Sequence, residues 1–273
     1  MKPRLSRAGI SLVLSMTLLL SCKNSPGSAD TPRHSDTKCP AYVAQGIEVS
    51  CITVKQATYV IVHIDLNAAL IKTLWKSPEG VPYGSLGEAY RQIGGDLLAV
   101  TNAGIFSAKH APEGLHIEGG MTLSPMNLDK GDGNFYWKPN GIFYVTDDGA
   151  GIMESEKFAS LNKQAAILEA TQSGPLLVID GEVNPGLKPD SRSLYARNGV
   201  GVKSADDVYI LISEDEVNLH DFASVFANQL SCRNALYLDG CVSQLYLPGR
   251  ASIPERRRCE KELVGLLGVM KRK

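Results

Sequence analysis

Short apolar runs, each closed by glycine, proline or asparagine, make up most of the chain beyond residue 40. Runs of this length that are rich in valine, isoleucine and leucine predict β-strands. The clearest are 59–66, 96–101, 165–171, 175–179 and 235–238. Residues 69–75 follow the first run closely, so we expect those two strands to pair.

Turn residues between neighbouring runs predict hairpins, because glycine and asparagine favour the tight turns that join antiparallel strands. The expected hairpins are 115–123 around Gly119-Gly120, 135–145 around Pro139-Asn140-Gly141, and 200–213 around 204–207.

Apolar residues at helical spacing predict about four helices. The first, 85–93, begins at Ser85 with Glu88 in position for a capping box and stops at Gly94-Gly95. The others are 156–162, 218–230 with Asn218 as a cap, and 255–271. Strands and helices do not alternate as in parallel α/β proteins. The predicted fold class is α+β, a single domain with a mostly antiparallel or mixed sheet, hairpins and about four helices.

The N-terminus has the pattern of a secretory signal. Lys2, Arg4 and Arg7 precede an apolar stretch at 10–20, which is too short for a typical membrane span. The stretch ends in Leu-Leu-Ser before Cys22, which resembles a bacterial lipobox and predicts lipidation of Cys22. A plain signal peptide followed by an unmodified cysteine is the alternative.

These features divide the chain into three parts. We expect a lipoprotein signal peptide at 1–21, a flexible polar tether at 22–38, and one folded domain at 39–273. Several acyl chains on Cys22 are enough for stable membrane anchoring. Lys23 is not the aspartate that retains lipoproteins in the inner membrane of enteric bacteria. The expected location is therefore the cell envelope, at the outer membrane and facing the periplasm.

Charge and cysteine content narrow the function classes. The net charge of -1 argues against general nucleic-acid binding. An oxidising compartment permits disulfides. Cys39 and Cys51 are the first choice of pair, and Cys232 with Cys241 would leave Cys259 free, although sequence does not settle the connectivity. We expect no metal and no cofactor, since Cys-x-x-Cys, histidine-rich and EF-hand spacings are missing.

Polar residues follow several of the buried runs. Side chains at the ends of strands commonly form sites, because a rigid scaffold positions them. The residues concerned are Asn102, Gly104, Gln172, Ser173, Arg197, Asn198, Asp239 and Ser243. Arginine binds phosphate oxygens and amides bind sugar hydroxyls, while a carboxylate can act as acid, base or nucleophile at an acetal carbon. For Asp239-Gly240 alone, a strand ending in a tight turn is the simpler interpretation.

Four segments in order resemble the motifs of the phosphodiester glycosidase family. Asn-Ala-Gly-Ile-Phe at 102–106 resembles Asn-Gly-Gly-Phe-Phe, and Arg-Asn-Gly-Val-Gly at 197–201 resembles Ser-Arg-Asn-Gly-Val-Gly. Leu-Asp-Gly-Cys-Val-Ser at 238–243 resembles Leu-Asp-Gly-Gly-Gly-Ser, and Thr-Gln-Ser-Gly-Pro at 171–175 lies between them. The resemblance covers roughly 51–247.

The resemblance implies hydrolysis of a sugar-1-phosphate diester, on a phosphorylated glycan of the envelope or outside the cell. Asp239 and Arg197 would be catalytic. The substrate would contact Asn102, Gly104, Gln172, Ser173, Asn198 and Ser243. Ala103, Ile105, Ala196 and Cys241-Val242 depart from the family pattern, which leaves the sugar undetermined.

Two other functions stay open. The chain could be a non-catalytic lipoprotein that binds glycans or phosphoglycans and keeps the fold, or a structural lipoprotein without a pocket at these residues. The presence of Arg197, Asn198 and Asp239 favours the enzyme.

Overall fold

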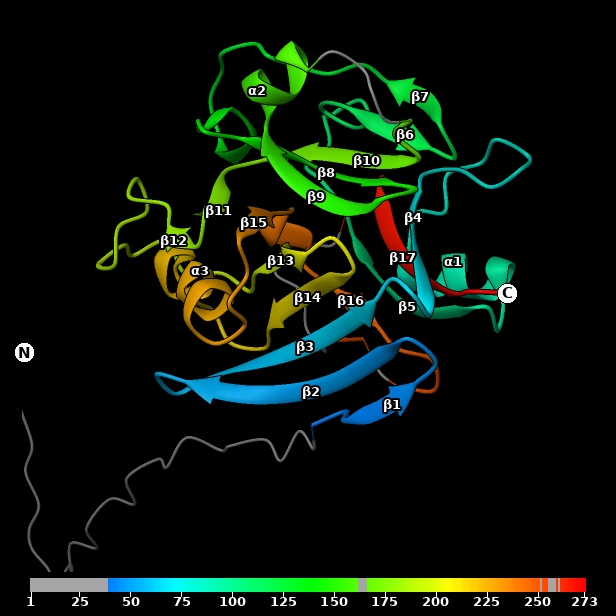
Figure 1. The fold of residues 1–273 in the computed structure, drawn as a ribbon, viewed down its shortest axis with the longest axis horizontal. Helices are drawn as coiled ribbons and strands as arrows, with labels where there is room; N and C mark the ends of the chain where they lie inside the picture. The colour runs from blue at the N-terminus through cyan, green and yellow to red at the C-terminus, as the bar shows by residue number, and fades with distance from the viewer. Residues whose placement is uncertain (1–38, 162–165, 251, 255–258, 260) are drawn as a thin grey trace, which may run out of the picture. The chain divides into compact units, whose positions relative to one another are not determined.

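All paired strands in the described part of the chain are antiparallel, and they form three sheets (Figure 1). The computed structural model describes residues 39–161, 166–250, 252–254, 259 and 261–273. The predicted signal peptide, Cys22 and the whole of the predicted tether lie outside these residues. No helix within the described residues is long and apolar enough to span a membrane.

The largest sheet has eight strands and contains the most apolar runs. Its strands in spatial order are β1 (Tyr42–Ala44), β2 (Ile47–Val54), β3 (Ala57–Asp65), β14 (Asp207–Ser213), β13 (Asn198–Ser204), β15 (Asn234–Tyr237), β11 (Leu176–Ile179) and β12 (Glu182–Val183).

Two smaller sheets complete the β structure. The five-stranded sheet contains β7 (Met121–Ser124), β6 (His116–Glu118), β10 (Glu169–Ser173), β8 (Gly141–Thr146) and β9 (Gly149–Glu154). The four-stranded sheet contains β16 (Leu245–Tyr246), β5 (Leu97–Asn102), β17 (Leu266–Lys271) and β4 (Ala69–Leu74). Side chains from all three sheets share one apolar core.

Three α-helices occur within the described residues: α1 (Leu86–Ile93), α2 (Ser155–Ser160) and α3 (Leu219–Asn228). Two 3₁₀ turns, η1 (Asn134–Tyr136) and η2 (Gly240–Val242), add to them. The predicted cap of α1 is confirmed, because Ser85 Oγ accepts from the Glu88 backbone N–H at 3.2 Å. Helix α3 lies on the eight-stranded sheet, where its Phe222 and Phe226 pack in a second apolar cluster (Figure 1).

The fold class holds in its main terms, with antiparallel sheets, hairpins and helices, but the fourth helix is wrong. The described end of the segment predicted as helix 255–271 is β17, which pairs with β4 on one side and β5 on the other. A short apolar run that is buried on both faces has no periodicity that separates a strand from a helix.

Two predicted strand pairings are also wrong. β4 pairs with β17 and not with β3, because β2 and β14 occupy both edges of β3. The hairpin around Pro139-Asn140-Gly141 is absent from the described residues. Residues 134–136 form η1, and β8 instead forms a hairpin with β9.

Candidate active site at the ends of strands β5, β13 and β15

Three of the motifs meet at one end of the eight-stranded sheet. Asn198 is the first residue of β13, and Asp239 follows β15, which runs antiparallel to β13 with Gly199 opposite Tyr237. Asn102 is the last residue of β5 in the neighbouring sheet. The expectation that strand ends bring these side chains together is confirmed for this group.

Asn102 and Asn198 form a buried amide pair. Asn198 Nδ2 donates to the backbone oxygen of Asn102 at 2.9 Å and to its Oδ1 at 3.0 Å. Asn102 Oδ1 also accepts from the Gln244 backbone N–H at 2.9 Å. The pair therefore joins the ends of two sheets, and its direct contact with a substrate stays a prediction.

The main chain at Asp239 is held by two of the predicted residues. Asn102 Nδ2 donates to the Asp239 carbonyl oxygen at 3.1 Å, and Ser243 Oγ lies 3.3 Å from the same oxygen. Ser243 Oγ also donates to Asn198 Oδ1 at 3.1 Å. None of these bonds uses the Asp239 carboxylate, so the network positions that group without occupying it.

The Asp239 carboxyl is in a desolvated environment. Burial raises its pKa above the ordinary value of 3.8, and the Cys241 backbone amide and the Lys261 charge act in the opposite direction. A carboxyl group whose pKa is raised in a partly enclosed position is typical of an acid, base or nucleophile in an active site.

Arg197 is almost completely buried, with 2% of its surface exposed. Its Nε donates to the Val217 carbonyl at 3.1 Å, Nη2 to the Ser193 carbonyl at 2.8 Å, and Nη1 to the Tyr237 hydroxyl at 2.6 Å. The acceptors of these hydrogen bonds are all carbonyl or hydroxyl oxygens, and the rings of Tyr195 and Tyr237 lie 4.8 and 5.3 Å from the guanidinium carbon. Among these acceptors in the described part of the chain no carboxylate neutralises the guanidinium, which is costly for a buried charge unless an anion binds there.

Tyr237 connects Arg197 to the Asp239 turn, and the sequence interpretation missed it. Its hydroxyl accepts from Arg197, and its ring lies 5.3 Å from the guanidinium carbon. The Asp239 charge helps to raise its pKa, although burial is the larger cause. Alternate residues of a strand point to the same face, so the spacing of Tyr237 and Asp239 was the available signal.

Two motif glycines are explained by close packing. A Cβ on Gly240 would lie 1.6 Å from the Tyr237 hydroxyl and 3.1 Å from Arg197 Nη1. A Cβ on Gly201 would lie 2.5 Å from the Phe226 ring of α3 and 2.7 Å from the Cys232 sulfur. Gly240 keeps space at the site, whereas Gly201 lets α3 approach the sheet.

The Thr-Gln-Ser-Gly-Pro motif lies at the end of β10, and the side chain of its Gln172 forms hydrogen bonds within the protein. Gln172 Oε1 accepts from the backbone N–H groups of Leu115 and Asn127 at 3.0 and 2.9 Å. Gln172 Nε2 donates to the Asn127 carbonyl at 2.6 Å and to Ser155 Oγ at 3.0 Å. These four bonds indicate that Gln172 holds the two segments that flank the β6–β7 hairpin, at Leu115 and at Asn127. Its predicted contact with a substrate is untested.

Gly104 and Ser173 lie where the segment after β5 contacts the end of β10. The Gly104 N–H donates to Thr171 Oγ1 at 3.2 Å, and a Cβ on Gly104 would lie 2.3 Å from the Gln172 carbonyl. Ser173 Oγ accepts from the Ile105 N–H at 3.4 Å and is fully buried. Both residues therefore fit the two segments together, and their substrate contacts stay predictions.

The disulfides are half as predicted. Cys39–Cys51 is confirmed, with the Cα atoms 5.9 Å apart. The second prediction is wrong: Cys241 pairs with Cys259, and Cys232 is the free, buried cysteine. Cys232 lies against Phe226 and Gly201 beneath α3, whereas Cys241 is on η2, so the fold separates them.

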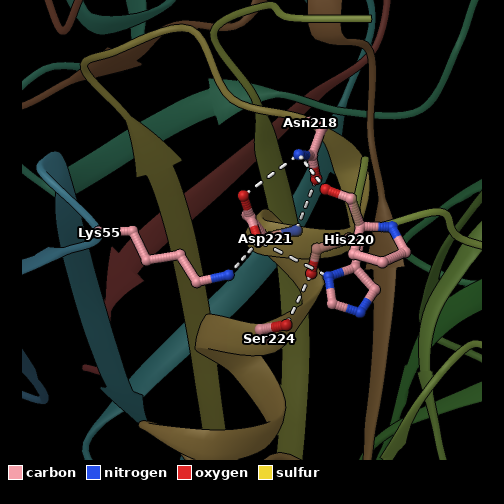
Figure 2. A network of polar contacts seen from close by, with 6 residues as sticks. Lys55, Asn218, His220, Asp221 and Ser224 are labelled. Carbon is pink, nitrogen blue, oxygen red and sulfur yellow. Dashed lines mark hydrogen bonds and ion pairs between the residues drawn. The ribbon is translucent and has the colours of Figure 1, made fainter. Parts of the chain in front are cut away.

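A polar network surrounds the start of α3 (Figure 2). Asn218 Oδ1 caps the helix by accepting from the Asp221 N–H at 2.8 Å, and Asp221 pairs with Lys55 at 2.8 Å. Figure 2 shows His220 and Ser224 beside them. Asn218 follows Val217, whose carbonyl accepts a hydrogen bond from Arg197. The cap at Asn218 therefore helps to hold the Val217 carbonyl in place for the guanidinium.

No group of three or more histidine, cysteine, aspartate or glutamate residues within the described ranges is placed to hold a metal ion. Cavities of about 400 and 290 Å³ lie away from the motifs, the first beside Tyr42 and Tyr90 and the second beside Lys72 and Arg272. We place the site at the motif residues because buried charge and a raised carboxyl pKa, rather than cavity size, carry the chemistry.

The chain matches the model of the phosphodiester glycosidase family over residues 95–262. It is 36% identical to the uncharacterized protein YigE of Escherichia coli K12 over 189 residues, which are 68% of this chain and 73% of that protein. Together with the ordered motifs, these matches show the family. The chain belongs to the phosphodiester glycosidases.

Two solved structures share the fold. The catalytic domain of zebrafish N-acetylglucosamine-1-phosphodiester α-N-acetylglucosaminidase, auto-inhibited by its pro-peptide, superposes with a TM-score of 0.56 at 16% identity, covering 84% of this chain and 83% of that one. A hypothetical protein from Synechocystis has a TM-score of 0.50 at 14% identity, covering 83% of this chain and 62% of that one. At such identities the likeness concerns the fold alone.

Proposed function

We propose that the protein hydrolyses the glycosidic bond of a sugar-1-phosphate diester on phosphorylated glycans of the bacterial cell envelope. The observation that carries the proposal is the buried Arg197, which has no carboxylate partner among the described residues and lies beside the Asp239 turn. A buried cation without a counterion favours an anionic ligand, and the family acts on sugar phosphodiesters.

In the proposed reaction, the bond between the anomeric carbon and the phosphate oxygen breaks. The oxygen keeps the electron pair, so the phosphate leaves on its other alcohol as a monoester. Water supplies the hydroxyl of the released sugar, and its proton passes to a base or to solvent. Asp239 serves as the carboxylate that attacks the anomeric carbon or accepts the proton from water.

Arg197 favours departure of the phosphate. Arg197 Nη1 donates to the Tyr237 hydroxyl, which lies next to Gly240. The positive charge of the guanidinium is therefore close to the Asp239 turn. Phosphate is a good leaving group and needs little protonation by an acid. One carboxylate with one arginine is therefore sufficient, whereas ordinary glycosidases use two carboxylates.

The proposed location is the outer membrane, facing the periplasm, with the lipid on Cys22 as the anchor. The support is the sequence pattern of residues 1–22. Globomycin, which blocks lipoprotein signal cleavage, should cause accumulation of the longer precursor. A Cys22→Ala variant should lose its membrane attachment. Membrane attachment of this variant at the wild-type level would contradict the anchor.

The test of the reaction is hydrolysis of synthetic sugar-1-phosphodiesters, with the released sugar and phosphate monoester both quantified. We expect Asp239→Asn to lower kcat by about 10²- to 10⁴-fold, the range found for acid–base groups. Asp148→Asn, a change of an exposed hairpin carboxylate, is the matched control and should retain full activity. Equal rates for wild type and Asp239→Asn would remove Asp239 from the mechanism.

A non-catalytic glycan-binding protein is the second candidate. The internal bonds of Gln172 and of the Asn102–Asn198 pair favour it, because these amides already serve the scaffold. Absence of hydrolysis on every diester tested, together with retained binding of the glycan, would support this candidate over the enzyme.

A further inference from the structure

The buried Arg197 has few hydrogen-bond donors left for a phosphate. Its Nε and Nη2 donate to the carbonyls of Val217 and Ser193, and Nη1 donates to the Tyr237 hydroxyl. These bonds hold the guanidinium rigidly but use most of its donors. A phosphodiester has two non-bridging oxygens that accept hydrogen bonds, and a second cation close to Arg197 would supply donors that the guanidinium has already used.

One described segment that carries a lysine is joined by a disulfide to the Asp239 turn. Cys259 is joined to Cys241, with Cα atoms 5.4 Å apart, and Cys241 lies in η2, two residues after Asp239. Further along, the Leu263 N–H donates to the Gly84 carbonyl at 2.8 Å. Leu263 also packs with Val242 in the apolar cluster beneath α1. Lys261 lies between these two attachments.

The positive charge of Lys261 acts on the Asp239 carboxyl, and the side chain is accessible to a ligand. Its ammonium lowers the pKa of the Asp239 carboxyl, although burial raises that pKa more. The lysine is exposed. Within the described part of the chain, no carboxylate forms an ion pair with it, in contrast to Lys55, which is paired with Asp221.

We propose that Lys261 is a phosphate-binding residue of the active site, and that the Cys241–Cys259 disulfide positions it beside Asp239. This inference rests on the proposed function for its ligand, an anionic phosphate on the anomeric carbon of a sugar. Lysine is a mobile point charge with three donors, and it complements an arginine that the protein holds in place.

The disulfide explains the cysteine in the Asp-Gly-Cys-Val-Ser segment. A bond between η2 and Cys259 ties the Asp239 turn to the segment that carries Lys261. Reduction of this bond removes that constraint. The lysine then has more conformations to lose on binding, and the affinity for phosphate falls.

The binding experiment uses the whole folded protein and N-acetylglucosamine 1-phosphate as the probe, with Kd measured by titration calorimetry. We expect Lys261→Ala to raise Kd at least tenfold and Lys261→Arg to keep it within about threefold, since arginine preserves the charge. Lys203→Ala is the matched control, because Lys203 is an exposed lysine near the far end of β13, and its Kd should equal that of the wild type.

The positioning role has its own pair of variants. Cys241→Ser/Cys259→Ser should raise Kd about as much as Lys261→Ala, whereas Cys39→Ser/Cys51→Ser removes the other disulfide and should leave Kd unchanged. Each double variant is first compared with the wild type by circular dichroism and thermal unfolding. If Cys241→Ser/Cys259→Ser does not fold, the same question is answered by Glu262→Pro, which disturbs the segment with the disulfide in place.

Turnover of a sugar-1-phosphodiester, measured in parallel, separates this inference from the proposed function. Hydrolysis by the wild type with an unchanged Kd in Lys261→Ala would overturn the inference and leave the function standing. Lys261-dependent binding without hydrolysis of any diester would overturn the function and support the inference. Absence of probe binding by the wild type would overturn the inference.

Discussion

Arg197 donates from Nη1 to the Tyr237 hydroxyl at 2.6 Å, and that hydroxyl lies where a side chain on Gly240 would have to be. Tyr237 of β15, the arginine that immediately precedes β13 and the turn at Asp239 are thus packed as one unit. The geometry makes the position of the Asp239 turn depend on groups that do not themselves react.

Tyr237→Phe should weaken both stability and activity. The change keeps the ring but leaves a buried Arg197 N–H without its acceptor, which costs about 1–3 kcal/mol. Urea unfolding should show this loss, and kcat/KM should fall. Tyr144→Phe is the control, since the Tyr144 hydroxyl has no hydrogen-bond partner among the described residues. An equal effect of the two changes would show that the Arg197–Tyr237 bond is unimportant.

Gly240→Ala should displace Tyr237 or the turn, because the added Cβ would lie 1.6 Å from the hydroxyl oxygen. Such overpacking costs about 1–3 kcal/mol, and we expect most of the activity to be lost. Gly87→Ala in α1 is the comparison, since a Cβ there meets nothing within 4 Å and alanine favours the helix. Wild-type melting temperature and activity in Gly240→Ala would contradict the packing argument.

The pH dependence should report Asp239. Burial raises the pKa of its carboxyl above 3.8, so the reactive carboxylate is lost on acidification at a higher pH than for an ordinary aspartate. We expect kcat/KM to fall as pH decreases through that raised pKa, and Lys261→Ala to move the fall to still higher pH. An acid limb that is unchanged in Lys261→Ala would contradict this assignment.

Stability should respond to the same group with the opposite sign. The folded state favours the protonated carboxyl, so ionisation of Asp239 destabilises the fold at pH values above the unfolded pKa. Asp239→Asn should therefore unfold at the same temperature as the wild type or higher at pH 7, while activity is lost. A lower melting temperature would indicate that the carboxylate has a structural role.

Gln172→Glu should loosen the loop between β7 and η1, which contains Asn127. A glutamate still accepts from the Leu115 and Asn127 N–H groups but no longer donates to the Asn127 carbonyl and Ser155. The unpaired carbonyl costs about 1–3 kcal/mol. Hydrogen exchange should accelerate at Asn127 and remain slow at Val200 in β13. Equal exchange rates at Asn127 in the wild type and in Gln172→Glu would show that Gln172 does not hold the loop.

Local patterns were sufficient for much of the secondary structure and for the family. Ser85 and Glu88 predict the start of α1, and Asn218 predicts the cap of α3, because capping is decided within one turn of chain. The Arg-Asn-Gly and Leu-Asp-Gly segments predict the strand ends that meet at the site. These features depend on residues that are neighbours in sequence.

Long-range pairing decided the rest. The run 266–271 becomes a strand because β4 and β5 are available on both sides of it, and its own residues do not choose between strand and helix. Cys241 pairs with Cys259 because η2 and the C-terminal segment are packed together, which spacing alone does not reveal. The partners of Arg197 come from Ser193, Val217 and Tyr237, and only the folded chain shows that they leave its charge without a carboxylate.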